Sequence, residues 1–337
     1  MTMSSARRRR VVVTGAGGFI GHHLVSRLKR QGAWVRGVDL KYPEYAPSDA
    51  DEFLIRDLRR WEACLEATAR VDDVYALAAD MGGMGFISNH HAEILRNNLL
   101  ISTHTLDAAR QNAVGRYLYT SSACVYPEYL QTNTDVEPLK EEDAYPAQPQ
   151  DAYGWEKLIT ERLCLHYGDD YGMDIRIVRF HNIFGPLGTW DGGREKAPAA
   201  LCRKVAVAKL TETNEIEIWG DGEQTRSFCY IDDCVAGLER VMASPYRDPL
   251  NLGQDRLISI NTLADLVAQA AGMVVTKRHV PGPQGVRGRN SNNDRLRQVL
   301  GWEPQVSLEE GIARTYRWIE ARVAESLGLR EVEHAVA

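Results

Sequence analysis

The sequence predicts an α/β protein with a doubly wound parallel sheet of the Rossmann type and a smaller, discontinuous lobe toward the C-terminus. An apolar run at residues 11–14 leads directly into a glycine-rich turn and then into an amphipathic segment. Apolar and amphipathic segments go on alternating as far as residue 186, which is the order of successive β-α-β units. Beyond residue 186 this alternation gives way to shorter segments and glycine-rich loops.

The strands of the sheet are expected where short runs rich in β-branched and aromatic residues stand between turn residues. In chain order these runs are residues 11–14, 35–39, 73–77, 117–121 and 175–180. Helices are expected where apolar residues recur at helical spacing, at residues 22–31, 94–111 and 152–167. Each of these helices stands between two strands, so that it provides the crossover that parallel strands need.

The chain after residue 186 has a different rhythm. Residues 188–198 and 281–293 are rich in glycine and charge, which predicts loops. A short strand is expected at 215–219, and helices at 198–207, 294–300 and 308–324. Residues 228–243 predict a strand end and a helix that return to the main sheet.

Two units follow from this change of rhythm. Residues 11–186 with about 228–258 are expected to form the sheet domain, and about 187–227 with 259–325 the second lobe. Residues 1–10, which include the basic run 7–10, and residues 328–337 are expected to be flexible tails.

Composition and charge narrow the class of function. The net charge of -6 and the pI near 5.9 argue against a nucleic-acid-binding surface. No apolar run approaches the ~20 residues that cross a bilayer, so no membrane span is expected. The six cysteines are scattered, with no C-x-x-C pair and no cluster with histidine. That pattern indicates a reducing, cytoplasmic setting and no metal site.

Three glycines lie between the first strand and the first helix. Gly15, Gly18 and Gly21 form the pattern G-x-x-G-x-x-G. Glycine permits a tight turn and lets the backbone approach a pyrophosphate, and the N-terminus of a helix favours its negative charge. In this strand–turn–helix setting the pattern predicts a dinucleotide site, with Phe19 and Ile20 inside it.

Acidic and small residues near the next strand ends indicate which dinucleotide binds. Asp39 ends the strand at 35–39, about 20 residues after the glycines. A carboxylate there accepts hydrogen bonds from a ribose 2′-hydroxyl and repels a 2′-phosphate, which favours NAD over NADP. Asp57 is expected near the adenine edge, and the small residue Ala78 is expected to pack against the cofactor.

A tyrosine and a lysine stand at the spacing of one helical turn. A phenol such as Tyr153 titrates near pH ~10, and the ammonium of Lys157 four residues later stabilises its phenolate. The upstream Ser122 is expected to hydrogen-bond the same substrate oxygen. Cys124, two residues past Ser122, adds another group that exchanges protons. The four residues together indicate a chemistry beyond simple alcohol oxidation.

These motifs resemble the extended short-chain dehydrogenase/reductase superfamily and, within it, the GDP-mannose 3,5-epimerase family. The resemblance covers roughly residues 11–325. Two of its strings, Met-Gly-Gly-Met-Gly and Gly-Gly-Arg-Glu-Lys, are not general features of the superfamily. The matching strings occupy residues 79–86, 121–128, 148–154, 179–186, 192–198, 219–222 and 285–291.

The resemblance implies an NAD-dependent isomerase that converts GDP-mannose to GDP-L-galactose, with GDP-L-gulose as a further product. The C4 hydroxyl is oxidised first, and Tyr153 takes its proton. The new ketone acidifies the hydrogens at C3 and C5, which Cys124 and Lys196 exchange as base and acid before C4 is reduced again. Ser122 and Lys157 complete the catalytic set, and Tyr153 and Lys157 also contact the cofactor. The sheet domain would bind NAD and the second lobe the nucleotide sugar.

The resemblance also implies substrate-binding residues and an assembly. Arginine and lysine suit a diphosphate, and glycines let backbone amides approach the sugar. In this superfamily, helices corresponding to residues 97–111 and 152–167 pair two subunits into a four-helix bundle, which implies a homodimer. The implied substrate-binding set is Gly82, Gly83, Ser122, Asn182, Lys196, Lys204, Gln224, Arg226, Arg287 and Ser291.

Two alternative functions remain. One is another NAD-linked nucleotide-sugar enzyme, such as a 4-epimerase or a 4,6-dehydratase. Such dehydratases carry an Asp-Glu pair where this chain has Ala123 and Cys124, and a 4-epimerase needs no cysteine–lysine pair. The other is a non-catalytic, NAD-sensing protein on the same fold, because fold alone does not fix function. Such proteins typically lack Tyr153 or Lys157, and both are present here.

Overall fold

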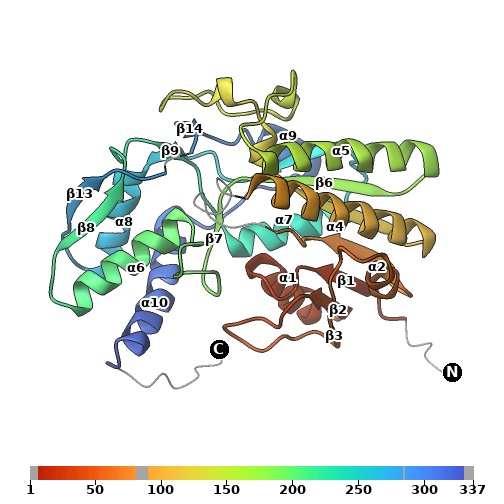
Figure 1. The fold of residues 1–337 in the computed structure, drawn as a ribbon, viewed down its shortest axis with the longest axis horizontal. Helices are drawn as coiled ribbons and strands as arrows, with labels where there is room; N and C mark the ends of the chain where they lie inside the picture. Colours follow the sequence, from red (N-terminus) through yellow and green to blue (C-terminus); the bar gives the residue numbers. More distant parts are fainter. Residues whose placement is uncertain (1–6, 81–89, 284, 330–337) are drawn as a thin grey trace.

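The computed structural model describes residues 7–80, 90–283 and 285–329 (Figure 1). Its centre is a sheet of seven strands that all run parallel. Their order is β11 (Pro249–Leu252), β6 (Ile175–Phe180), β5 (Arg116–Ser122), β4 (Asp73–Ala76), β1 (Arg10–Thr14), β2 (Trp34–Asp39) and β3 (Glu52–Ile55). The order reverses between β1 and β4, which confirms the predicted doubly wound α/β class.

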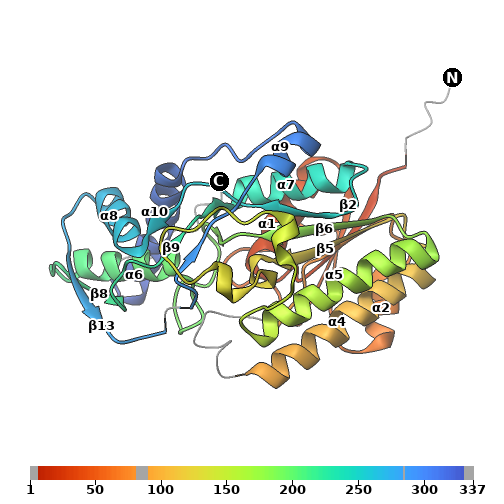
Figure 2. The same cartoon turned by 90° about the horizontal axis from the view of Figure 1, so that it is seen from above.

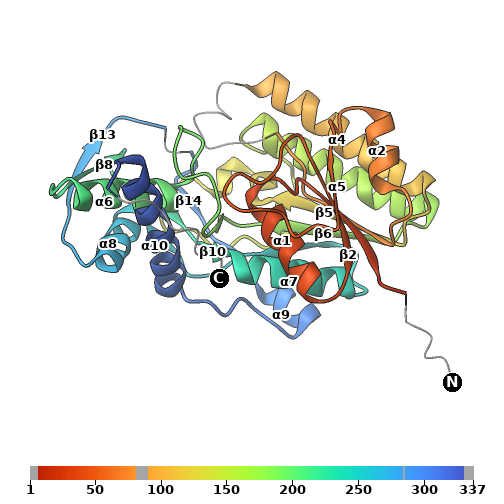
Figure 3. The same cartoon turned by 90° about the horizontal axis from the view of Figure 1, so that it is seen from below.

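Helices cover both faces of this sheet (Figures 2 and 3). On one face lie α2 (Trp61–Thr68), α4 (His91–Gln111) and α5 (Ala152–Tyr171), and on the other α1 (Phe19–Arg30), α7 (Ile231–Ala243) and α9 (Asp294–Leu300). The alternation along β1 follows this division: Val12 packs into the core on the α2/α4 side, and Val11 and Val13 into the core on the α1/α7 side. Burial on both faces explains why the inner strands read as unbroken apolar runs.

The later part of the chain builds a second group of elements beside the carboxyl ends of the strands (Figure 2). Three helices pack together there: α6 (Ala197–Leu210), α8 (Ile260–Ala271) and α10 (Leu308–Ser326). β8 (Glu215–Trp219) pairs with β13 (Thr276–Val280), and β9 (Thr225–Arg226) pairs with both β12 (Ile258–Ser259) and β14 (Gly288–Arg289). Ile216 and Ile218 point from β8 into the core, and the residues that alternate with them, Glu215, Glu217 and Trp219, are exposed.

One predicted strand does not join the main sheet. β10 (Cys229–Tyr230) pairs instead with β7 (Ile183–Phe184) in a separate two-stranded sheet. The helix that follows it, α7, does return to the main sheet, where it packs against β5 and β6. The strand that completes this edge is β11, which the sequence analysis did not predict. Because it has only four residues and begins at a proline, its sequence gives only a weak signal for a strand.

The expectation of a flexible tail up to residue 10 is wrong for residues 7–10. Arg10 begins β1, and its guanidinium lies 3.5 Å from the centre of the Trp34 ring. Arg9 pairs with Asp73, a carboxylate with only 1% of its side chain exposed. The buried carboxylate of Asp73 requires such a cationic partner, so the basic run is part of the folded structure at the amino ends of the strands.

Among the described residues, no helix is long and apolar enough to cross a membrane.

Candidate active site

The glycine turn after β1 forms a close backbone cradle. Gly15 has φ +72, a conformation that favours glycine. A Cβ atom on Gly21 would lie 2.1 Å from the Gly15 carbonyl oxygen, and one on Gly17 would lie 2.1 Å from the Lys41 carbonyl oxygen. Side chains are therefore excluded at the two places where the turn meets α1 and the end of β2. Helix α1 begins at Phe19, so the free N–H groups of its first turn would face an anion that binds at this turn.

Asp39 is tied to the same turn. Its Oδ2 accepts a hydrogen bond from the Gly17 N–H at 2.9 Å, and its Oδ1 accepts one from the Leu40 N–H at 2.6 Å. Burial raises the pKa of this carboxyl, and the backbone N–H groups oppose the rise. The side chain is thus held in place beside the glycines, where a ribose would lie.

The two other predicted cofactor residues differ in their surroundings. Ala78 follows β4, and its N–H donates to the Thr14 hydroxyl at 3.1 Å, so the chain passes close to the glycine turn. A Cβ on Gly15 would lie only 3.0 Å from the Ala78 nitrogen. Asp57 instead forms an ion pair with Arg59 at 2.8 Å, which lowers the pKa of its carboxyl. The cradle, the anchored Asp39 and the close approach of Ala78 fit a dinucleotide such as NAD.

The predicted tyrosine, lysine and serine meet at the carboxyl end of β5. Asp151 caps α5 by accepting a hydrogen bond from the Gly154 N–H at 2.8 Å. Tyr153 lies buried in the first turn, and the Lys157 Nζ lies 5.5 Å from the centre of its ring. Lys157 also donates to the Thr120 carbonyl at 3.1 Å. Burial raises the pKa of the Tyr153 phenol, and a hydrogen bond with Ser122 opposes the rise.

Cys124 lies against the same helix. It belongs to the short 3-10 turn η1 (Ala123–Val125), and its N–H donates to the Ser122 hydroxyl at 3.2 Å. A Cβ on Gly154 would lie 2.2 Å from the Cys124 carbonyl oxygen, so glycine is what lets α5 approach this turn. The thiol is half-buried and accepts a hydrogen bond from Arg289 Nη1 at 3.4 Å.

Lys196 approaches from the other side as the residue before α6. The loop that carries it is fixed by Glu195, which pairs with Arg203 at 2.8 Å. Part of Lys196 is exposed to solvent, but the protein around its side chain lowers the pKa of the ammonium by desolvation. The thiols of Cys124 and Cys234 oppose that shift. The structure therefore brings Lys196 within electrostatic reach of Cys124.

Two arginines add positive charge beside Cys124. Arg226 on β9 lies opposite Arg289 on β14 in the register of these paired strands. Burial, and then the charge of Arg289, lower the pKa of Arg226 to about 9. Arg226 is one of the predicted substrate residues, whereas Arg289 is not; the only signal for Arg289 in the sequence is its place in the string 285–291. Such a pair of cations favours a bound anion.

The remaining predicted substrate residues form two groups. Lys204 donates to the Glu217 carbonyl at 2.7 Å, and its Nζ lies 5.6 Å from the centre of the Trp219 ring. Gln224 donates to the Trp219 carbonyl at 3.2 Å, while its own Oε1 is buried without a partner among the described residues. Lys204, Trp219 and Gln224 thus lie together at the end of β8.

The other group is already engaged within the protein. Asn182 donates to the Ser227 carbonyl at 2.9 Å, and Arg287 forms a bidentate ion pair with Asp221. Ser291 is fully buried, and its hydroxyl donates to Asn293. Direct contact of Ser291 with a ligand, which the sequence analysis expected, is therefore incompatible with this arrangement. Gly82 and Gly83 lie outside the described residues.

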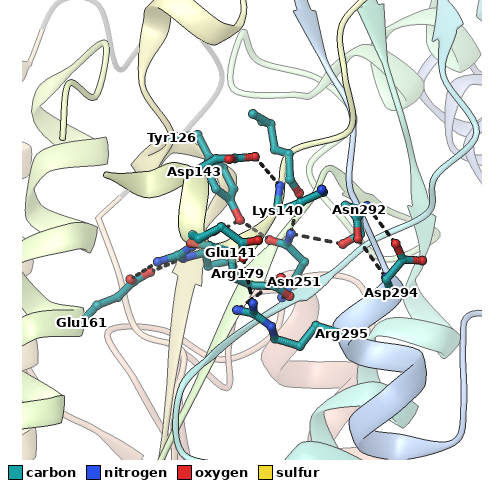
Figure 4. A network of polar contacts seen from close by, with 12 residues as sticks. Tyr126, Lys140, Glu141, Asp143, Glu161, Arg179, Asn251, Asn292, Asp294 and Arg295 are labelled. Atoms are coloured by element: carbon teal, nitrogen blue, oxygen red, sulfur yellow. Dashed lines mark hydrogen bonds and ion pairs between the residues drawn. The ribbon is translucent and has the colours of Figure 1, made fainter. Parts of the chain in front are cut away.

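A buried ion pair, which Figure 4 shows, lies near the turn that carries Ser122 and Cys124. Arg179 on β6 pairs with Glu161 on α5 at 2.7 Å, and both side chains are almost fully buried. Arg179 also donates to the Tyr126 hydroxyl, and the Ser121 hydroxyl donates to Glu161. Ser121 and Tyr126 flank Ser122 and Cys124 in the sequence, so the network holds the turn against α5 from both ends.

The described residues contain no group of three His, Cys, Asp or Glu side chains that would hold a metal ion. The arrangement instead combines a dinucleotide cradle with three kinds of proton-transfer group. The phenol is Tyr153, the thiol is Cys124 and the amine is Lys196. Such a set is able to oxidise an alcohol and to exchange protons on carbons next to the new ketone.

Comparisons with known proteins agree with this geometry. The family model described as "NAD dependent epimerase/dehydratase family" matches residues 11–253. The chain is 51% identical over 316 residues to GDP-mannose 3,5-epimerase of Arabidopsis thaliana, covering 93% of this chain and 83% of that protein.

Solved structures of nucleotide-sugar epimerases have the same fold. UDP-glucose 4-epimerase of Thermotoga maritima with UDP-glucose matches with a TM-score of 0.84 and 25% identity, covering 93% of this chain and 99% of that one. UDP-glucuronic acid 4-epimerase of Bacillus cereus, in complex with UDP-glucuronic acid and NAD, matches with a TM-score of 0.79, 25% identity and the same coverage.

Proposed function

The chain belongs to the NAD-dependent epimerase/dehydratase family, in its GDP-mannose 3,5-epimerase branch, and on that premise we propose that it inverts C3 and C5 of GDP-mannose to give GDP-L-galactose. It is an NAD-dependent isomerase. The observation that carries the proposal is the meeting of Cys124 and Lys196 with the Tyr153–Lys157 pair, because C4 redox chemistry alone requires no such thiol and amine.

Oxidation at C4 requires a base for the hydroxyl proton, and we assign that role to Tyr153. Ser122 hydrogen-bonds the phenol and is placed to share the substrate oxygen. The ammonium of Lys157, held by the Thr120 carbonyl, stabilises the phenolate. The glycine turn and Asp39 would hold NAD, which would supply a hydride acceptor for the oxidation of C4 and a hydride donor for its reduction.

Proton exchange at C3 and C5 then falls to Cys124 and Lys196. We assign Cys124 as the base, and Arg289 donates a hydrogen bond to its sulfur while Arg226 lies opposite Arg289 on the paired strand. Desolvation lowers the pKa of Lys196, which makes its ammonium a better acid near neutral pH. Because Lys196 directly precedes α6 and Cys124 lies in the turn after β5, the two groups are suited to opposite faces of the sugar ring.

For the rest of the nucleotide sugar we propose a path across the second group of elements. Arg226 and Lys204 supply charge for the diphosphate, and the exposed Trp219 with Gln224 suits a base edge. Asn182 and Arg287 contribute only if they exchange their present partners. Gly82 and Gly83 are also proposed to bind the sugar. This path supports the proposed division into an NAD domain, residues 11–186 with about 228–258, and a nucleotide-sugar lobe, about 187–227 with 259–325. Helix α9 falls within the second of the lobe's ranges but packs against β11 of the main sheet.

The proposal is tested by incubating the purified protein with GDP-mannose in D2O and following the sugar by NMR. Deuterium at C3 and C5 with formation of GDP-L-galactose is the expected result. Label at C5 alone with a gulose product would restrict the reaction to a 5-epimerisation. If no label enters and no new sugar forms, the 3,5-epimerase assignment is wrong, and other nucleotide sugars become the substrates to test.

We also propose a homodimer through α4 and α5, in a cytoplasmic setting. The two helices pack side by side on one face (Figure 2), and Trp155 and Ile159 are 41% and 46% exposed one turn apart on α5. Such an exposed apolar pair is suited to burial against a second copy. The described cysteines are all free thiols, as in reducing compartments.

Changing Trp155 and Ile159 together to glutamate is expected to convert the dimer to a monomer, because two charges would be buried in the apolar interface. Light scattering at micromolar concentration measures the mass. Val274→Glu is the control, since Val274 is 87% exposed away from these helices and its variant should stay dimeric. A wild-type monomer, or a double variant that remains dimeric, would refute this interface.

A further inference from the structure

Glu156 on α5 has a buried carboxyl group to which the proposed reaction assigns no role. It lies between Tyr153 and Lys157 on α5 and has no exposed surface. Its Oε1 accepts a hydrogen bond from Asn98 Nδ2 at 3.0 Å and lies 3.7 Å from Lys157 Nζ. Its Oε2 is buried and has no hydrogen-bond partner among the described residues. An unsatisfied buried carboxyl oxygen destabilises the fold, so Glu156 is poorly explained as a stabilising residue.

The groups that face Glu156 come from three elements. From α4, Asn98 bonds it and also donates to the Asp80 carbonyl, while the Asp80 carboxylate accepts from Asn97. From β5, the phenol of Tyr119 lies within its field, as Asp151 does from the start of α5. Lys157 is the cation at its side and Tyr153 the second phenol that it acts on.

We propose that Glu156 is a positioning residue that acts through its charge on Tyr153 and Lys157, so that Tyr153 keeps the proton it takes from the C4 hydroxyl until C4 is reduced again. The inference rests on the proposed function. In that reaction Tyr153 must hold one proton while Cys124 and Lys196 exchange others at neighbouring carbons. A simple dehydrogenase releases its product after the oxidation, so its tyrosine does not have to retain the proton for a later reduction.

The electrostatics act in the required direction. After burial, the charge of Glu156 is the next largest cause that raises the pKa of Tyr153. Burial also raises the pKa of Glu156 itself, while Lys157 and Asn98 oppose that rise and favour its ionised form. A negative charge beside a phenol disfavours the phenolate. Glu156 therefore balances Lys157, which stabilises the phenolate, and the balance sets how readily Tyr153 releases its proton.

Glu156→Gln tests this role with little change of shape. The amide oxygen keeps the bond from Asn98, and the amide nitrogen takes the place of the unpartnered oxygen. Loss of the negative charge lowers the pKa of Tyr153, so the acidic limb of the kcat/KM profile should move to lower pH, by about one pH unit. Bound NADH should also accumulate during turnover, because Tyr153 loses its proton more readily before the final reduction.

Asp73→Asn is the matched control. Asp73 is also a carboxylate with 1% exposure, but it pairs with Arg9 and Arg116 at the amino end of β4. Breaking those pairs should lower the melting temperature without moving the pH profile. Glu156→Gln should move the profile with little loss of stability, and Glu156→Met, of similar length, takes its place if the glutamine variant does not fold.

A second readout does not depend on turnover. Phenolate absorbance of the NAD-loaded protein is titrated for wild type and Glu156→Gln, each against its Tyr153→Phe counterpart, so that the difference isolates Tyr153. Ionisation at lower pH in Glu156→Gln is expected. An unshifted titration in a folded variant overturns the role of Glu156, whereas a wild type inactive on GDP-mannose that still shows the shift would reject only the proposed substrate.

Discussion

Replacing Tyr153 by phenylalanine is expected to stop the reaction before any carbon-bound hydrogen exchanges. The change removes only the hydroxyl that bonds with Ser122 and leaves the buried ring in place. Without this base the C4 hydroxyl is not oxidised, and without the ketone the hydrogens at C3 and C5 are not acidic. The rate should fall by a factor on the order of 10²–10⁴, the usual contribution of a general base.

The measurement for Tyr153→Phe combines NADH absorbance with deuterium uptake from D2O. Neither signal should appear, while binding of NAD, which depends on the glycine turn and Asp39, should persist. Tyr171→Phe is the control, because Tyr171 is 57% exposed at the far end of the same helix and should leave turnover unchanged. Full turnover of Tyr153→Phe would exclude the scheme in which C4 is oxidised first.

Cys124→Ala is expected to separate the two halves of the reaction. C4 oxidation depends on Tyr153 and Lys157 and should continue, so NADH should still form. Deuterium exchange at C3 and C5 should fall on the order of 10²-fold or more, because the base beside Arg289 is gone. The substrate should then be recovered largely unepimerised.

The control for Cys124→Ala is Cys64→Ala, which removes a thiol that is buried on α2 and bonded to the Leu58 carbonyl. It should cost some stability and leave the exchange intact. Epimerisation at the wild-type rate in Cys124→Ala would remove Cys124 from the mechanism. Loss of NADH formation as well would mean that the thiol also contributes to C4 oxidation.

Local pattern was enough to predict the parts of the site that are close in sequence. The strand at β1, the glycine turn and α1 follow one another directly, and Tyr153 and Lys157 are one turn apart on α5. In both cases the spacing along the chain fixes the spacing in space, because strand and helix geometry are local properties. The position of Asp39 was predictable for a similar reason, because the end of β2 lies next to the glycine turn.

Contacts between distant segments were not predictable in this way. Arg289 reaches Cys124 across 165 residues, and the carboxyl of Glu156 is paired through Asn98, 58 residues away. Arg287 and Arg289 are two residues apart in one string, yet one pairs with Asp221 and the other with the active-site thiol. Ser291, in the same string, turns inward and is buried. No local signal separates these outcomes.

The sequence by itself therefore determined the fold class, the NAD cradle and the Tyr153–Lys157 pair, because each depends on the periodicity of one short segment. Only the tertiary structure decided which charges surround Cys124, Lys196 and Glu156. Those surroundings come from β5, α4, α6, β9 and β14, which meet at the carboxyl edge of the sheet. Burial and charge at this meeting point shift proton affinities, and they depend on where all of these elements pack together.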